Sequence, residues 1–248
     1  MNTVYILWLR QVKRAVRSRA RIIGALGQPI LFLFALGFGL GPMYQKAGGG
    51  DYLAFIAPGI IAMSVLFTSI FSGIEIIWDR QFGFLKETLV APVPRFHVML
   101  GRTFGGATVA IMQGVLVFCI ALIAGFRPYS IVMAPVALLA AILIGLLFTA
   151  LGTAIASILS DMQGFQLIMN FLVMPLFFLS GALFPLSSAP EALRVIGVFD
   201  PLSYGVDAVR GALTGMSYFG LGVDFAVLGA LVIFAVWLGS YLFSKIEA

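Results

Sequence analysis

Long apolar runs are the feature that most constrains how this chain can fold. Only 10% of its 248 residues are charged and its mean hydropathy is +1.09, whereas soluble proteins carry about 25% charged residues. Such a chain cannot cover a water-facing surface, and a helix of about 20 apolar residues crosses a bilayer. We therefore predict an all-α, polytopic membrane protein with six transmembrane helices. These spans form one domain, 22–248, and lie at about 22–41, 52–77, 103–125, 131–159, 165–184 and 223–244.

The basic N-terminal segment, 1–21, is predicted to form an amphipathic helix on the cytoplasmic membrane surface. Tyr5, Trp8, Val12 and Val16 are spaced to share one helix face, and most of the arginines fall opposite them. A basic face opposite a Trp-bearing face is typical of an interfacial helix. The alternative is a positive flank that only anchors the first span. Because the apolar run that follows is long enough to stay in the bilayer, we do not expect a cleaved signal peptide.

The distribution of Lys and Arg predicts the orientation of the spans. With the N-terminus inside, eleven of the 15 basic residues fall on inner segments and four on outer ones. Cytoplasmic loops carry this excess of positive charge, so both termini are predicted to be cytoplasmic, in the inner (plasma) membrane. The net charge of +5 then reflects membrane topology, and no nucleic-acid partner is expected.

The most charged interruption between two spans is the stretch 79–95, which holds five charged residues. Its middle has helix-forming character, and Pro92 and Pro94 would end that helix before the third span. Glu75 lies one turn before the stretch, where it can pair with a basic residue such as Arg80. We refer to 79–95 as the inner elbow, and predict that another protein binds it.

The segment 185–222 is too long for a turn and too apolar for a solvated loop. Its sequence predicts two short helices, 189–199 and 203–213, that dip back into the outer membrane surface, where the backbone must be hydrogen-bonded. Asp207 and Arg210 are three residues apart, so they can pair if the second stretch is helical.

The sequence lacks the residue sets of several kinds of enzyme. A single histidine, His97, excludes a two-histidine zinc site, and a single cysteine, Cys119, excludes a disulfide framework or thiolate cluster. Neither a Gly-x-Ser-x-Gly elbow nor a phosphate-binding Gly-x-x-x-x-Gly-Lys-[Ser/Thr] loop occurs. We predict no enzyme activity, cofactor or metal in this chain; if ATP drives it, a separate chain hydrolyses the ATP.

Four motifs, in this order, resemble the membrane (permease) subunit of a type-2 ABC exporter, the group that includes drug-resistance and polysaccharide exporters. The second motif departs from the family pattern at one position, Gln81, where many members of that family have Glu. The motifs are Ala57-Pro58-Gly59, Asp79-Arg80-Gln81-x-Gly83-x-x-Lys86-Glu87-x-Leu89-x-x-Pro92-x-x-Arg95, Leu179-Ser180-Gly181-x-x-Phe184-Pro185 and Asp200-Pro201-Leu202-Ser203-Tyr204-x-x-Asp207-x-x-Arg210.

The resemblance implies a transporter of two membrane subunits and two separate ATP-binding subunits, with ATP and Mg²⁺ on the latter. The inner elbow would be the coupling helix that docks on the ATPase, with 84–91 as its helical core. Its implied contact residues are Asp79, Arg80, Gly83, Phe84, Leu85, Lys86, Glu87, Leu89, Pro92 and Arg95.

The resemblance also assigns roles to three other regions. The short loop at 160–164, with Asp161, would be a second ATPase contact. The N-terminal interface helix would touch the ATPase, and the outer helices would cap the translocation path. The residues concerned are Trp8, Arg10, Arg14 and Arg17 in the first helix, and Asp200, Pro201, Tyr204, Asp207 and Arg210 in the outer segment.

The cargo stays open between a drug, a lipid and a lipid-linked glycan, as does the choice between a homodimer and a heterodimer of membrane subunits. Asn170, Phe171 and Phe178 are the candidate path residues, because an amide that faces lipid is costly. The alternative function is a secondary carrier driven by an ion gradient. Such a carrier would show inverted repeats and charged groups at mid-membrane, and neither pattern is evident.

Overall fold

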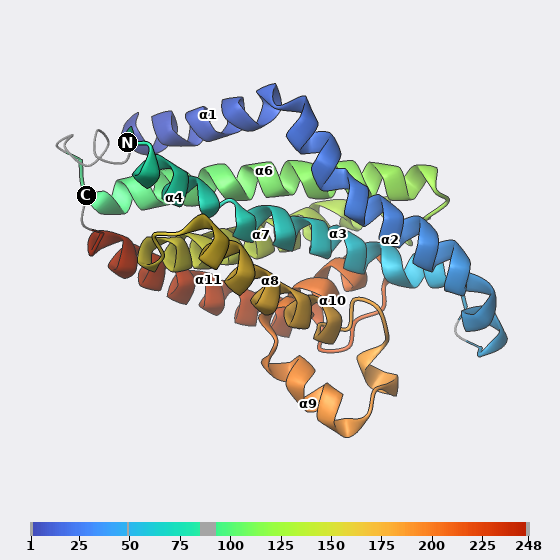
Figure 1. The fold of residues 1–248 in the computed structure, drawn as a ribbon. Helices are drawn as coiled ribbons and strands as arrows, with labels where there is room; N and C mark the ends of the chain where they lie inside the picture. Colours follow the sequence, from blue (N-terminus) through green and yellow to red (C-terminus); the bar gives the residue numbers. More distant parts are fainter. Residues whose placement is uncertain (1, 49, 85–92, 247–248) are drawn as a thin grey trace.

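The computed structural model describes residues 2–48, 50–84 and 93–246, and within these ranges the regular structure is entirely helical. Long helices run side by side, and α1 begins at the same end of the bundle at which α11 ends (Figure 1). The helices are α1 (Asn2–Arg17), α2 (Arg19–Lys46), α3 (Tyr52–Phe71), α4 (Ile74–Gln81), α6 (Arg95–Ile123), η1 (Ile131–Met133), α7 (Ala134–Ile158), α8 (Met162–Leu179), η2 (Leu186–Ser188), α9 (Glu191–Phe199), α10 (Pro201–Thr214) and α11 (Leu221–Ser244).

Six helical stretches of the described chain are long and apolar enough to cross a membrane, as predicted. They are Arg19–Lys46, Tyr52–Gln81, Arg95–Ile123, Ile131–Ile158, Met162–Leu179 and Leu221–Ser244. The third begins at Arg95, eight residues earlier than the predicted start at 103, because Pro94 opens the helix and the intervening charges are accommodated at its inner end.

The second span is the centre of the bundle. In this span 83% of the most apolar stretch is buried, against 17% for α2 and for α11. Helices α2, α6, α7 and α10 pack around α3, and Ile56, Ile60, Leu66 and Ile70 are completely buried. A helix that is apolar on all sides is expected to occupy such a position.

The second span is interrupted at Ser72–Gly73, where α3 ends and α4 begins. At this point the backbone of the span crosses α7 so closely that a Cβ on Gly73 would overlap the carbonyl group of Gly152, and a Cβ on Gly152 would overlap that of Ile70. Pro58, the one proline within α3, lies inside the continuous helix and far from this interruption. The interruption is therefore set by a contact with α7 and not by proline.

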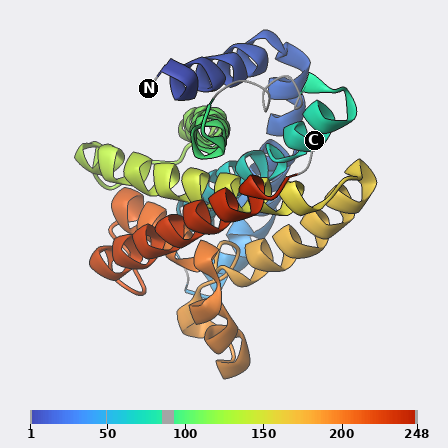
Figure 2. The same ribbon diagram turned by 90° about the vertical axis from the view of Figure 1, so that its left-hand side faces the viewer.

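Helix α1 packs against the inner half of α6, side by side in Figure 1. It crosses α6 obliquely, since α6 (green) is seen end-on in Figure 2 while α1 (blue) runs across the view. Gly101 and Gly105 of α6 allow the approach: added Cβ atoms would lie 2.8 Å from the Cβ of Leu7 and 2.7 Å from Oε1 of Gln11. Small residues four apart let helices pack closely.

We predict that Gly152→Ala destabilises the subunit by about 1–3 kcal/mol, because the new methyl group has no space against Ile70. Gly229→Ala is the matched control, since it also lies within a helix and an added Cβ there meets nothing within 4 Å. Thermal unfolding in detergent measures both variants. Equal melting temperatures for the two would contradict the close crossing of α3 and α7.

Candidate functional site

A group of ion pairs lies where α1, α4 and α6 meet, at the end of the bundle that carries the inner elbow. We call this the inner end and the opposite one the outer end. The Asp79 side chain, 7% exposed, accepts a hydrogen bond of 2.6 Å from the equally buried guanidinium of Arg102 and one of 3.5 Å from Arg10. Arg10 is 46% exposed, so its pairing is partly screened by solvent. The Asp79–Arg102 pair joins the start of the inner elbow to α6.

A second carboxylate, Glu75, lies one turn earlier on α4 and is also buried. It accepts hydrogen bonds from Arg21 (2.7 Å) and from the Gln11 amide (3.1 Å), and Arg14 lies 4.0 Å away. Glu75 thus pairs with a basic residue, as predicted, but its partner is Arg21 and not Arg80 on the same helix. Its partners come from α1 and α2, because the buried face of α4 is turned toward those helices.

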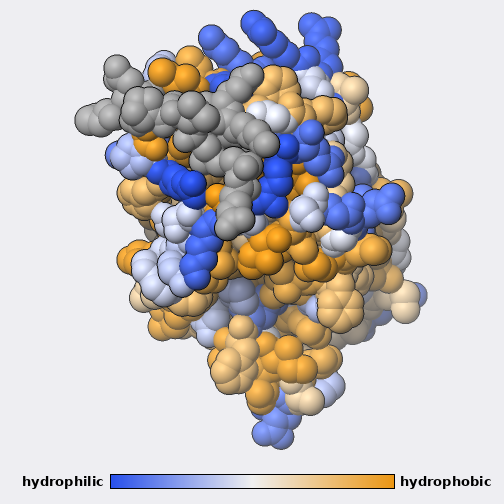
Figure 3. Space-filling model, turned by 60° about the vertical axis from the view of Figure 1, so that its left-hand side comes forward, coloured by the Kyte–Doolittle hydropathy of each residue, from blue (hydrophilic) through white to orange (hydrophobic). Residues whose placement is uncertain are grey.

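These contacts form two neighbouring clusters, one around each carboxylate of α4. Together we call them the inner charge network and define it as Arg10, Gln11, Arg14, Arg21, Glu75, Asp79 and Arg102. It ties α1 and α2 to the central span and to α6. Figure 3 shows hydrophilic side chains gathered at the end of the molecule that carries α1. Of the predicted interface-helix residues, Arg10 and Arg14 belong to the network, Trp8 donates to the Thr108 hydroxyl at 3.0 Å, and Arg17 is exposed.

The predicted coupling core falls largely outside the described residues. Helix α4 ends at Gln81 and Gly83 turns the chain with a φ of +81°. Phe84 is 51% exposed. The residues that lie outside the described ranges are Leu85, Lys86, Glu87, Leu89 and Pro92.

The two ends of the inner elbow are anchored within the subunit. Asp79 and Arg80 turn inward, and Arg95 donates to the carbonyl oxygens of Ile246 (2.9 Å) and Ser244 (2.5 Å) at the end of α11. These contacts tie the described ends of the inner elbow to α6, α7 and α11, and Arg95 remains exposed.

The structure brings the loop at 160–164 next to the inner elbow. Arg80 donates to the carbonyl oxygens of Ser157 (3.3 Å) and Leu159 (3.2 Å), and Gln81 donates to that of Ser160 at 3.4 Å. Asp161 is exposed and caps α8 by accepting from the Gly164 N–H at 2.6 Å. Two segments about 80 residues apart thus share one face of the bundle.

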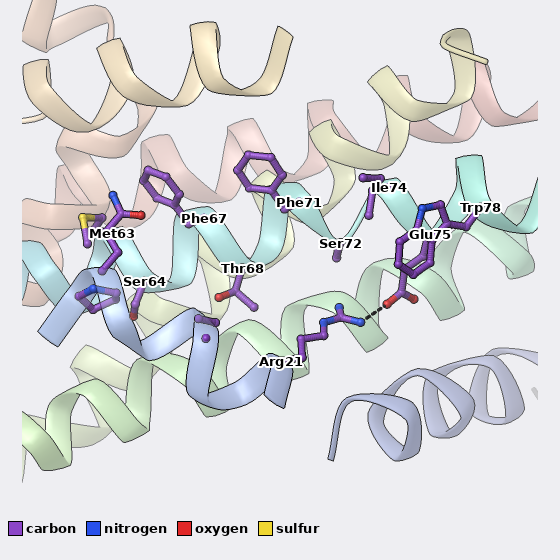
Figure 4. Close-up of a pocket in the computed structure, with 14 residues that line it drawn as sticks. Arg21, Met63, Ser64, Phe67, Thr68, Phe71, Ser72, Ile74, Glu75 and Trp78 are labelled. Carbon is purple, nitrogen blue, oxygen red and sulfur yellow. Dashed lines mark hydrogen bonds and ion pairs between the residues drawn. The ribbon is translucent and has the colours of Figure 1, made fainter. Parts of the chain in front are cut away.

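A groove of about 330 Å³ lies between α2 and the second span, and ends inward at the inner charge network. Ser64 and Thr68 point to one side of α3, toward α2, whereas Phe67 and Phe71 point to the other (Figure 4). The Arg21–Glu75 ion pair closes its inner end (Figure 4). The groove therefore combines hydroxyl groups, aromatic rings and one end with paired charges.

The candidate path residues do not line this groove. Asn170, Phe171 and Phe178 lie on the exposed side of α8, with 83% of Phe171 and 44% of Phe178 accessible. The side of α8 that packs into the bundle carries Phe165, Met169, Val173 and Phe177. Within one subunit the three predicted residues face outward, so a path that includes them requires a second subunit.

The outer segment forms two short helices, as predicted, but the Asp207–Arg210 pair does not form. Arg210 is buried and donates to the carbonyl oxygen of Gly181 at 3.0 Å, with its guanidinium 4.1 Å from the ring centre of Phe55. Asp207 turns the other way and accepts from the chain that precedes α11. Carbonyl groups at the end of α8 thus take the place of the expected carboxylate.

Asp200 and Pro201 begin α10, where the carboxylate accepts from the Leu202 N–H at 2.8 Å. Burial raises the pKa of Asp200 to about 7, against the lowering effect of the Leu202 N–H. Tyr204, one turn on, donates its hydroxyl to the Val198 carbonyl at 2.8 Å and so ties α10 to α9. α10 is enclosed by α3, α7 and α11, whereas α9 projects from the bundle (Figure 1).

Sequence reasoning missed three buried polar residues, Gln11 and Arg102 at the inner end and Asp224 at the outer end, and the role of the exposed Arg21 as a partner of Glu75. The spacing of Gly101 and Gly105 was a usable signal, because it marks the face of α6 on which α1 packs. Asp224 carried no comparable signal, since it stands alone at the start of a span.

The ABC-2 type transporter family matches residues 2–214. The chain belongs to this family. It is similar to nodulation protein J of Rhizobium leguminosarum bv. trifolii, at 30% identity over 85% of this chain and 78% of that protein. It is also similar to nodulation protein J of Sinorhizobium fredii (28%, over 94% and 85%) and to transport permease ycf38 of Cyanophora paradoxa (27%, over 99% and 89%).

As an ABC-2 transport permease, the chain is an integral membrane protein and the membrane subunit of an ABC transporter. Permeases of this family are transport components and pair with an ATP-binding subunit, which agrees with the sequence analysis. The location of ATP and Mg²⁺ on that partner stays a prediction.

For this ABC-2 permease we predict that Asp79→Ala costs about 3–5 kcal/mol of stability, because it leaves the Arg102 guanidinium buried without its carboxylate. Arg10→Ala removes the half-exposed partner of the same carboxylate and costs about 1 kcal/mol or less. Thermal unfolding of the purified subunit compares them. A small, equal loss in both variants would show that the buried pair does not stabilise the inner end.

The raised pKa of Asp200 predicts a stability that falls as pH rises. In the folded protein the Asp200 carboxyl group keeps its proton up to about pH 7. In the unfolded chain the same group loses this proton near pH ~3.9. Between these values the folded state binds the extra proton, so raising the pH costs stability. Asp200→Asn retains the cap on Leu202 without titrating. The free energy of unfolding of Asp200→Asn, relative to that of the native protein, should therefore increase between pH 4 and 7, by about 3 kcal/mol.

Denaturation of the purified ABC-2 permease across this pH range measures the effect. Asp51→Asn is the control, because Asp51 makes the same type of cap, to the Leu53 N–H at 3.0 Å, but is exposed. If Asp200→Asn and Asp51→Asn show the same pH dependence, burial of Asp200 is not its cause.

Proposed function

We propose that this chain is the membrane subunit of an ATP-driven exporter and that the inner elbow and the loop at 160–164 form one docking face for a separate ATP-binding subunit. The observation that carries this proposal is Arg80, which bonds α4 to the carbonyl groups of Ser157 and Leu159. A rigid contact between the two segments lets a single partner bind both. Family membership supports the existence of such a partner.

The same anchoring would transmit a movement of the ATPase into the membrane. α4 continues the central span, and its carboxylates are tied to α1, α2 and α6 by the inner charge network. A force on the elbow therefore moves α4 together with these helices. The interruption at Ser72–Gly73 is the place where the inner end can turn relative to α3, as in other rigid-body transitions.

The groove between α2 and α3 supports an amphiphilic cargo. Its hydroxyl groups and its aromatic rings lie on opposite sides of α3 (Figure 4), which suits a molecule with a polar and an apolar part. A drug, a lipid and a lipid-linked glycan all meet this description. We propose that cargo of this class enters here for export.

A second copy of the chain would complete the path. The outward side of α8 carries Asn170 as well as Phe171, and an amide that faces lipid is costly. A second membrane subunit against α8 removes this cost and places Asn170, Phe171 and Phe178 at the interface. The assembly would then hold two membrane subunits and two ATP-binding subunits, in the inner membrane, with both termini cytoplasmic as the Lys and Arg bias indicates.

The experiment for this proposal is co-purification with a candidate ATP-binding subunit from the same organism. Glu87→Lys is expected to reduce the association by about tenfold or more, because it reverses a charge in the proposed docking helix. Glu191→Lys, the same change at an exposed position of α9 on the outer segment, should leave it unchanged.

Equal association of both variants would contradict docking through the inner elbow. ATP-dependent export in vesicles that contain both subunits then tests the exporter itself. Transport by the membrane subunit alone under an ion gradient would contradict it.

A further inference from the structure

Two buried carboxyl groups face each other at the outer end of the bundle, Asp207 on α10 and Asp224 in the first turn of α11. Asp224 is 0% exposed and Asp207 is 4% exposed. The two side chains lie within hydrogen-bonding range of each other. No cation is paired with either of them among the described residues, since Arg210 on the same helix is turned to Phe55 and Gly181.

The hydrogen-bond donors around this pair are distributed very unequally. Asp207 accepts from the Ser217 hydroxyl and from the backbone N–H groups of Tyr218 and Phe219, each at 2.8 Å. Neither oxygen of Asp224 has a donor within the described chain. Donors stabilise the ionised form of a carboxyl group, so Asp207 is built to be charged and Asp224 is not.

We infer that Asp224 carries a proton and donates it to Asp207, so that the two residues form a proton-binding site at the outer end of the subunit. Two ionised carboxylates are both acceptors and cannot bond each other, whereas a protonated carboxyl has one O–H donor. One proton therefore satisfies Asp224 and removes the repulsion between two adjacent buried charges. Carboxyl pairs that share one proton in this way are known in other proteins.

The surroundings favour a proton over a metal cation. Hard cations such as Ca²⁺ require six to eight oxygen ligands, but Asp207 is approached by N–H and O–H hydrogens, which repel a cation. No group of three or more His, Cys, Asp or Glu side chains suited to a metal occurs in residues 2–48, 50–84 and 93–246.

Few other ionisable groups face Asp224. On α10 these are Asp207 and Tyr204, and Tyr204 is close enough to interact electrostatically with Asp224. Tyr218 lies on the turn before α11. Helix α7, which packs along α11, has no ionisable side chain, and within the span of α6 beyond Arg102 the only one is Cys119. Arg210 also interacts electrostatically with Asp207, although no ion pair joins them. Loss of the proton would therefore leave two adjacent negative charges between α10 and α11, with Arg210 acting on Asp207 only from a distance.

The site communicates with the outer side through a cavity of about 670 Å³, whose ionisable lining residues are Tyr44, Asp51, Asp207, Arg210 and Tyr218. Protons can reach Asp207 from this cavity. Because the pair holds α10 against the start of α11, a rise in outer pH would loosen that contact. The inference concerns the subunit alone and does not need the ATP-binding partner, so its test is independent of the proposed function.

The direct measurement is infrared spectroscopy of the purified subunit, in which a protonated carboxyl group gives its own C=O band. Asp200→Asn serves as the background, because Asp200 also holds a proton near neutral pH. We expect a protonated-carboxyl band at pH 7 that disappears in the Asp200→Asn/Asp224→Asn double variant. Glu191→Gln, at an exposed outer position, should leave the band unchanged.

Thermal unfolding supplies a second readout in the same background. The melting temperature should fall by roughly 5 °C or more as the pH rises above about 4, because the folded pair keeps a proton that the unfolded carboxyl groups have lost. It should stay constant in Asp224→Asn, whose amide donates to Asp207 at every pH. If Asp224→Asn does not fold, Asp207→Asn replaces it. This change turns the acceptor of the Asp224 proton from a charged carboxylate into a neutral amide, so the protonated-carboxyl band should shift in frequency.

Two outcomes would overturn the inference. One is a carboxyl band and a pH dependence that persist unchanged in the variants. The other is stabilisation of the protein by Na⁺, K⁺, Mg²⁺ or Ca²⁺ at constant pH and ionic strength that Asp224→Asn abolishes, which would place a cation between the carboxylates.

Discussion

The burial of two carboxylates at the inner end of the central span is the constraint on which much of this structure depends. Charged groups removed from water must be paired, and α4 itself supplies no cation on its buried face. Arg102 of α6 and Arg21 of α2 provide the charge, and Gln11 of α1 adds a hydrogen bond. Three other helices are thereby fixed to the segment that leads into the inner elbow.

The acidic residues at the two ends of the bundle have different kinds of partner. At the inner end guanidinium groups neutralise Glu75 and Asp79. At the outer end Arg210 is directed to backbone carbonyl groups, Asp207 accepts from N–H and O–H donors, and Asp224 faces only Asp207. The inner end is therefore suited to transmit force through permanent charges, whereas the outer end holds carboxyl groups whose charge depends on protons.

Close backbone contacts complete the architecture between these ends. Gly152 lets α7 cross the interruption of the second span, and Gly101 and Gly105 admit α1 against α6. Helices in lipid gain little from the hydrophobic effect between them, so packing at small residues carries much of their association. These crossings hold α4 and the loop at 160–164 side by side, which the proposed docking face requires.

The sequence by itself determined the helical class and the six membrane-spanning stretches, because hydropathy over 20 residues is a local property that decides whether a segment crosses a membrane. It also predicted the two short outer helices. Tertiary structure decided which charges meet: Glu75 pairs with Arg21 and not Arg80, and Arg210 binds carbonyl groups and not Asp207. Sequence spacing describes neighbours on one helix only, whereas these partners lie on different helices and depend on how the helices pack.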